Sequence, residues 1–116
     1  MGQDEVLHFP AFPKPTPRVI LWEGAGRPDE AAIHDELTRG GYGVVRYRQE
    51  AGAGYGPHAH VYPEMMWVME GSLTILLPSE ARVLELRIGD RIEMPQGFVH
   101  GVVAGEDGAL YLLATK

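Results

Sequence analysis

Between Gly41 and the end of the chain, short apolar segments follow one another with only turn-forming residues between them. These segments are rich in β-branched, aromatic and leucine residues, which is the pattern of β-strands joined by tight turns. Short strands at this density are typical of a sandwich or a barrel. The sequence therefore predicts an all-β fold. The expected strands are YGVVRYRQ, EMMWVMEG, SLTILLP, ARVLELRI, DRIEMP, FVHGVVA and ALYLLAT.

The N-terminal segment FPAFPKPTP contains four prolines. Proline cannot donate a hydrogen bond to a helix or a sheet, so we expect residues 1–17 to form an extended arm and residues 18–116 to form a single domain. Phe9, Phe12 and Trp22 would expose large apolar surfaces if the segment trailed in water, and such surfaces usually mark contacts. We therefore expect a homodimer in which this segment packs on or beside the partner's sheet. The alternative is a monomer whose arm folds back over its own barrel mouth and covers the same residues.

Two further elements are expected between the arm and Gly41. The segment RVILWEG is interpreted as a short strand that ends at Gly24. The segment RPDEAAIHDELTRGG has a proline and acidic residues at its start and two glycines at its end, which predicts one short helix. Ile33 and Leu37 lie four residues apart and should face inward together.

Composition excludes several classes of function. The 116 residues include 10 basic and 16 acidic side chains, a net charge of −6, and the sequence has no basic run, so nucleic acid is not an expected partner. The absence of cysteine excludes disulfides and thiolate chemistry. No apolar stretch is long enough to span a membrane, and the N-terminus lacks the pattern of a signal peptide. We therefore expect a cytoplasmic protein, in which His8 and His34 are solvated.

Histidine and glutamate recur in one short segment. His58 and His60 are two residues apart, so on a strand their side chains point to the same side. Glu64 has the same parity, and His100 follows a Pro-x-Gly turn at the start of another expected strand. Three imidazoles and one carboxylate are the ligands that divalent transition metals prefer. An isolated His-x-His pair is more often solvated than bound to metal. The prediction of a metal site therefore depends on the residues around the pair as well.

Glycines frame both segments. From Gly52 to Gly71 the pattern is G-x5-H-x-H-x3-E-x6-G, and from Gly89 onward it is G-x5-P-x-G-x2-H. Together these resemble the paired motifs of the cupin superfamily, in its small single-domain (conserved-barrel) form. The resemblance implies a jelly-roll barrel, also called a double-stranded β-helix, with a metal inside one mouth. The one departure is Ala104, where the second motif usually ends in an asparagine that supports the structure. The metal ligands that the resemblance implies are His58, His60, Glu64 and His100.

The implied cofactor is one divalent ion per chain, for which manganese, iron, nickel, copper and zinc all fit the ligand set. An octahedral ion with four protein ligands keeps two positions for water or substrate. The first hypothesis is a metal-dependent enzyme of dioxygenase, decarboxylase or isomerase type, acting on a small anionic or enol-type substrate. The alternatives are a binding or sensor module without turnover, and a structural metal. No catalytic residue can be assigned from the sequence.

The pocket beside the metal should be lined by residues that share parity with the ligands. These are Met66 and Val68 after Glu64, and Phe98 and Val102 beside His100, although ordinary core packing is the commoner role of such residues. In the segment VVRYR, either Arg46 and Arg48 or Val45 and Tyr47 face the pocket. Met65, Trp67 and Met69 are expected to belong to the core.

Overall fold

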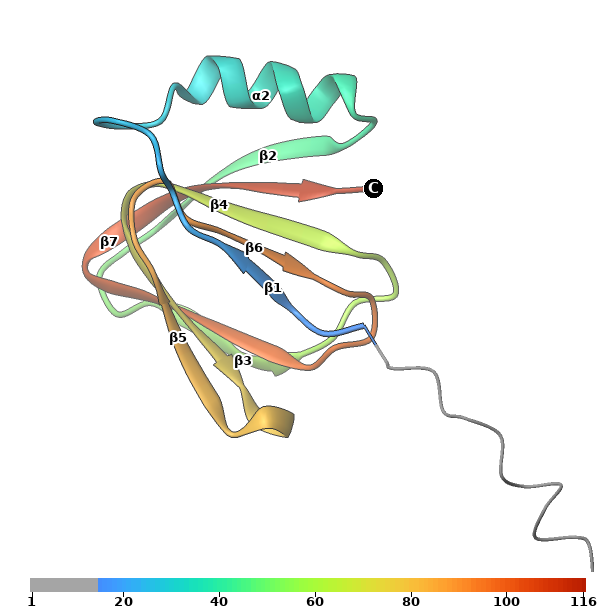
Figure 1. Cartoon of the computed structure of the whole chain (residues 1–116). Helices are drawn as coiled ribbons and strands as arrows, with labels where there is room; N and C mark the ends of the chain where they lie inside the picture. Colours follow the sequence, from blue (N-terminus) through green and yellow to red (C-terminus); the bar gives the residue numbers. More distant parts are fainter. Residues whose placement is uncertain (1–14) are drawn as a thin grey trace, which may run out of the picture.

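The computed structural model describes residues 15–116. Within this range the chain forms strands, one α-helix and one turn of 3-10 helix (Figure 1). In chain order the elements are β1 (Arg18–Ile20), α2 (Glu30–Arg39), β2 (Gly43–Gln49), β3 (Gly54–His58), β4 (Glu64–Leu77), η1 (Pro78–Glu80), β5 (Arg82–Leu86), β6 (Arg91–Met94) and β7 (His100–Thr115). No helix in this range is long and apolar enough to cross a membrane.

Two long antiparallel strands, β4 and β7, organise the barrel. The first half of β4 pairs with β6 on one side and with the second half of β7 on the other, and β1 and β2 extend this layer at its two edges. The second half of β4 pairs with β5 and with the first half of β7, which in turn pairs with β3. Because both long strands bend, their halves belong to two facing layers, as Figure 1 shows. The expected all-β jelly roll with one short helix is confirmed.

The expectation of short strands throughout was wrong for these two elements. EMMWVMEG and SLTILLP form one continuous strand, β4, and FVHGVVA and ALYLLAT form one continuous strand, β7. Gly71 and Gly108 have φ angles of +70° and +76°, and the pairing register shifts beside Gly71. The glycines therefore bend the strands from one layer to the other instead of ending them.

The strand expected to end at Gly24 stops earlier, at Ile20. The backbone N–H of Trp22 donates to Asp90 Oδ1 at 2.9 Å, and the indole ring lies against Gly89, where a side chain would collide with it. Trp22 thus packs on its own barrel, where it is half-buried. Most of the expected arm, including His8, Phe9 and Phe12, lies outside the described residues.

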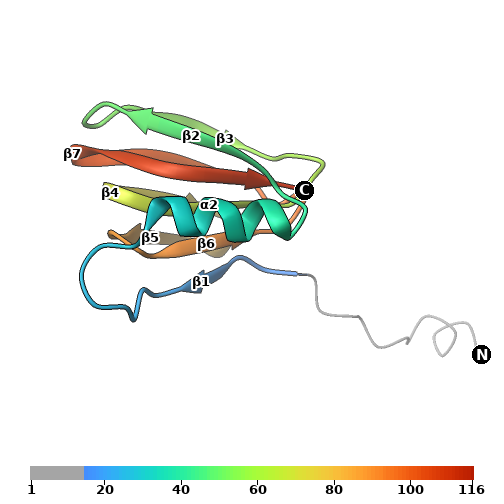
Figure 2. The same cartoon turned by 90° about the horizontal axis from the view of Figure 1, so that it is seen from above.

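Helix α2 covers the outer face of the first layer (Figure 2). The side chain of Asp29 accepts from the N–H of Ala32 at 3.1 Å and caps the helix start. Ile33 and Leu37 are buried, as expected. They pack in a cluster with Met65, Trp67, Met69, Leu110, Leu112 and Ala114. The methionines and the tryptophan are therefore core residues, as the sequence predicted.

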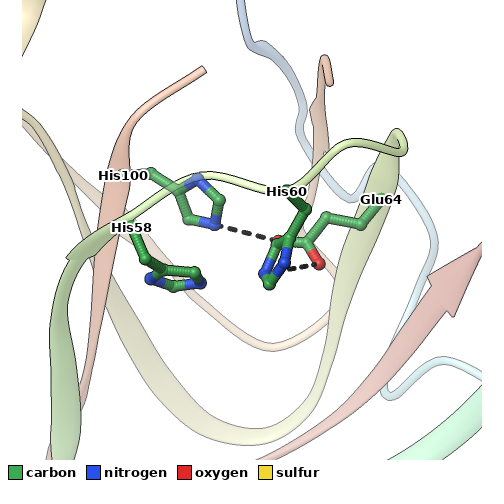
Figure 3. Close-up of side chains that lie close together, drawn as sticks. All are labelled: His58, His60, Glu64 and His100. Atoms are coloured by element: carbon green, nitrogen blue, oxygen red, sulfur yellow. Dashed lines mark hydrogen bonds and ion pairs between the residues drawn. The ribbon is translucent and has the colours of Figure 1, made fainter. Parts of the chain in front are cut away.

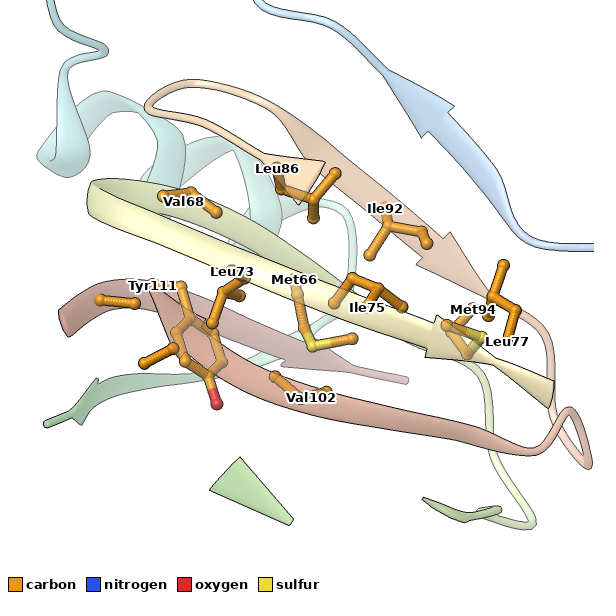
Figure 4. Close-up of a cluster of buried hydrophobic side chains, with 12 residues drawn as sticks. Met66, Val68, Leu73, Ile75, Leu77, Leu86, Ile92, Met94, Val102 and Tyr111 are labelled. Carbon is orange, nitrogen blue, oxygen red and sulfur yellow. The ribbon is translucent and has the colours of Figure 1, made fainter. Parts of the chain in front are cut away.

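The main core fills the space between the two layers (Figure 4). Alternate residues of β4 point into it, so Met66 and Val68 are fully buried on the inner face while Met65 and Trp67 face the helix. Val102 is also fully buried, and Phe98 packs against this core. The expected inward direction of these side chains is confirmed, and their role is core packing.

The barrel is open along one side. β2 and β3 are the outer strands of their layers on this side, and each pairs with β7, not with the other. Their inner faces are therefore only partly covered, and Val45, Tyr47 and Tyr55 are exposed. This opening leads toward the histidine-rich end of the barrel.

Candidate metal centre

The two glycine-framed segments meet at one end of the barrel. His58 ends β3, His100 begins β7, and the two residues are directly paired across these strands. Glu64 begins β4, and His60 lies in the connection between β3 and β4. The backbone N–H of Gly97 donates to the carbonyl of His60 at 2.7 Å, which ties the two segments together. The topology thus brings together residues that are far apart in sequence.

Four side chains converge at this point, as Figure 3 shows. One potential ligand atom from each of His58, His60, Glu64 and His100 lies within 4.8 Å of the others. Opposite ligand atoms of an ion with bonds of about 2.1 Å are about 4.2 Å apart, so shifts of a few tenths of an ångström would bring all four atoms into bonding distance. Imidazole and carboxylate donors at this spacing fit a divalent transition metal.

Backbone carbonyls hold two of the imidazole rings in place. Nδ1 of His58 lies 3.1 Å from the carbonyl oxygen of Gly56, and Nδ1 of His100 lies 2.9 Å from that of Phe98. A proton on each Nδ1 would be donated to the carbonyl, which leaves Nε2 as the coordinating atom. This arrangement orients metal-binding histidines and strengthens them as ligands.

Glu64 and His100 form a buried pair. Glu64 is 5% exposed and His100 is 1% exposed, and Oε1 of the carboxylate lies 2.9 Å from Nε2 of the imidazole. Burial alone would lower the pKa of His100, but the hydrogen bonds to Glu64 and to the Phe98 carbonyl, together with the Glu64 charge, raise this pKa above its ordinary value. The contact between the two side chains thus involves Nε2 of His100, the atom that would face a metal.

A cavity of about 480 Å³ opens onto the cluster between β2 and β3. The sequence alone did not decide which face of β2 lines the pocket; the structure shows that it is the face with Tyr47. Arg46 lies on the other face and forms an ion pair with Glu30 of the helix at 2.8 Å. The lining residues are Tyr47, Tyr55, Gly56, His58, His60, Tyr62, Glu64 and Leu113.

The expected apolar wall was wrong. Met66, Val68, Phe98 and Val102 do not line the cavity, which is bounded instead by tyrosine rings and Leu113. Regular alternation along β3 would put Tyr55 on the face opposite His58. The register of β3 shifts between these residues, which brings their rings to a centroid distance of 4.7 Å.

The hydroxyl groups behind the cavity are protonated. Burial raises the pKa of Tyr55, although a hydrogen bond with Tyr111 acts in the opposite direction, and the charge of Glu64 adds to the increase. Burial also raises the pKa of Tyr111, to a larger extent. The hydroxyl of Tyr111 donates to Oε1 of Gln49 at 2.5 Å. The hydroxyl of Tyr55, which lines the cavity, can therefore hydrogen-bond a ligand without adding negative charge.

Comparison with known proteins identifies the family. The cupin family model matches residues 17–116, which is most of the chain. The chain belongs to the cupin family. No curated protein sequence matches this cupin at a significant level.

Several solved cupin-like structures resemble this one. KdgF from Halomonas sp. is 28% identical over 62% of this cupin and 66% of its own chain, with a TM-score of 0.56. The polyketide cyclase RemF from Streptomyces resistomycificus is 27% identical over 64% and 52% of the two chains, with a TM-score of 0.57. Oxalate decarboxylase of Bacillus subtilis, which has Mn(II) centres, is 28% identical over 63% of this cupin but 20% of its own chain, with a TM-score of 0.57. The match thus spans less than two thirds of the length of each of these three proteins.

Proposed function

We propose that this cupin binds one divalent metal ion per chain and is a metal-dependent enzyme acting on a small anionic or enol-type substrate. The proposed ligands are His58, His60, Glu64 and His100. The observation that carries the proposal is the convergence of their four donor atoms within 4.8 Å at the inner end of an open cavity. A closed surface cluster would have no room for a substrate.

Charge and access support a substrate-binding role. Three neutral imidazoles and one carboxylate contribute a charge of −1, so a bound divalent ion would leave the centre at +1. Bound there, the ion would supply a Lewis acid that attracts and polarises an anionic oxygen of the substrate. His58 and His60 are only partly buried and line the cavity, whereas His100 and Glu64 close the deep side. A ligand entering between β2 and β3 would therefore meet the open side of the cluster.

The tyrosines supply the remaining functional groups. Tyr47 and Tyr55 line the cavity on the side of the β2–β3 opening. Their hydroxyl groups can hydrogen-bond a substrate oxygen or donate a proton to it. This supports reactions that move a proton beside a polarised carbonyl or carboxylate, such as decarboxylation or isomerisation. Oxygenation would use the same free coordination positions of the ion, so it is also part of the proposal.

The similar structures support the same range of reactions. One is an oxalate decarboxylase with manganese centres and another is a polyketide cyclase. Because the cupin fold serves many chemistries, these likenesses support a metal-dependent enzyme and leave the substrate open. Manganese is the first ion to test, followed by iron, nickel, copper and zinc.

The test is metal binding followed by turnover. The purified protein is loaded with each ion and its metal content is measured, and we expect about one ion per chain. His60→Ala and His100→Ala should each lose most of the metal, while His34→Ala, on the exposed face of α2, should keep it. The loaded protein is then assayed with a panel of small acids and enols. Full metal retention by both ligand variants would refute the assignment.

The second candidate function is a binding or sensor module without turnover. The open cavity supports it as well as it supports an enzyme. Saturable ligand binding to the loaded protein without any product would favour this candidate. A coordination sphere without exchangeable positions would instead favour a structural metal.

We also propose that the protein is a cytoplasmic homodimer, with residues 1–17 as an arm on the domain of residues 18–116. In the described residues, β1 is an edge strand that pairs only with β6, and Leu21 beside it is 65% exposed. An edge strand next to an exposed leucine can accept a further strand.

A further inference from the structure

The cavity at the metal cluster has an unusual distribution of charge. None of the described residues that line it is lysine or arginine. Arg46 is paired with Glu30 on the outer face of β2, and Arg48 lines a different groove. Under the proposed function, on which this inference rests, the metal is thus the only positive centre that faces a ligand in the part of the chain that the structure describes. One anionic group would be neutralised there, and a second would be desolvated without a counter-ion.

The walls of the cavity are aromatic and held in place. Tyr47 stacks on the buried ring of Tyr111 with centroids 5.8 Å apart and planes 20° apart. Tyr62 stacks on His60 at 4.9 Å and 14°. Tyr55 meets the ring of His58 edge-on at 4.7 Å. Each exposed tyrosine therefore rests on another ring, so little side-chain entropy is lost when a ligand binds between them.

We propose that this cavity selects a planar aromatic monoanion, with its oxygen donors at the histidine and glutamate cluster and its ring against Tyr47, Tyr55 and Tyr62. Aromatic rings gain additional affinity from stacked and edge-to-face contacts with tyrosine. Leu113 adds an apolar surface beside Glu64 and Tyr47. Aliphatic acids would use only the metal, and diacids would place their second charge against neutral rings.

Hydroxamates with the same chelating group distinguish the contribution of the cavity wall to affinity from that of the metal. Acetohydroxamate and benzohydroxamate carry the same chelating group, and they differ in a methyl or a phenyl substituent. Their dissociation constants are measured by calorimetry on the metal-loaded full chain. We expect benzohydroxamate to bind about tenfold more tightly. We expect 3-carboxybenzohydroxamate to bind about tenfold more weakly than benzohydroxamate.

Variants of the protein then identify the side chains responsible for the phenyl preference. Tyr47→Ala removes a ring from β2, and Tyr62→Ala removes one from the connection between β3 and β4. Each variant should reduce the phenyl preference several-fold while the affinity for acetohydroxamate stays constant. Tyr42→Ala is the control, because Tyr42 packs near the helix and outside the cavity. Equal binding of the two simple hydroxamates, or a preference unchanged in both variants, would overturn the aromatic selection while metal binding stands. Equal or tighter binding of the carboxylated compound would overturn the selection for a single charge. Binding of no hydroxamate to the loaded protein would overturn the proposed function itself.

Discussion

Replacing Glu64 with glutamine removes the only carboxylate of the cluster and preserves its size. The side chain is almost completely buried, so no other group or water shell can replace its charge. Loss of a hydrogen-bonded partner behind a metal ligand already lowers metal affinity by 10- to 100-fold, and loss of the ligand charge itself should cost at least about 100-fold.

This loss can be converted into a change in melting temperature. At a free metal concentration 100 times the dissociation constant, binding stabilises the native protein by about 2.7 kcal/mol. For a domain of this size, about 4 °C accompanies each kcal/mol, so metal should raise the Tm by about 11 °C. At the same metal concentration Glu64→Gln would be only half saturated and would gain about 0.4 kcal/mol, or less than about 2 °C.

The assay is thermal unfolding of both proteins with metal and with a chelator, followed by circular dichroism. The chelated wild type should melt at a lower temperature yet keep its β-type spectrum, because the described core is apolar and does not involve the cluster. Glu93→Gln is the matched control, since Glu93 lies outside the cluster, where it forms an ion pair with the exposed Arg18, and this variant should show the full shift. An equal metal-induced shift in Glu64→Gln would refute the role of this carboxylate.

Three further predictions concern protons, the strand bend and assembly. The pKa of His100 lies above its ordinary value of 6.5, so protons compete with metal for this side chain. Metal affinity should therefore decrease as the pH falls through that raised pKa, starting above pH 6.5. Equal metal affinity in titrations on both sides of pH 6.5 would contradict this. Gly71→Ala should destabilise the protein by about 2–4 kcal/mol in denaturant unfolding, since φ is +70° and the new Cβ would collide with the Gly108 carbonyl. Gly56→Ala is the control, because its Cβ would meet no atom within 4 Å, and this variant should change the stability little. Light scattering should give a dimer mass, and a monomer mass would refute the dimer.

Much of the candidate site could be predicted because its residues lie in local patterns. The spacing of His58, His60 and Glu64 follows from strand geometry and a short connection, and the turn at Gly97 places His100 at the start of β7. Helix α2 was equally predictable, because its cap and its inward-facing pair are encoded within one short segment.

The cavity wall could not be predicted, because it depends on features that the sequence does not display. The register shift in β3 brings Tyr55 beside His58, against the regular alternation. Tyr111 is buried in the second half of β7, which the glycine pattern divided into two strands. The opening between β2 and β3 is a property of strand pairing, so the exposure of Tyr47 follows only from the topology. One usable signal was missed: Tyr62 lies two residues after His60 and two before Glu64, between two of the expected ligands.

The most direct test of the central claim is anomalous diffraction from crystals of the metal-loaded protein, recorded at the absorption edge of the metal. We predict one peak per chain, at about 2.0–2.3 Å from Nε2 of the three histidines and from a carboxylate oxygen of Glu64, with at least one further position held by water or ligand. A loaded crystal with no peak at this cluster, or with its ion bound elsewhere on the chain, would contradict the account.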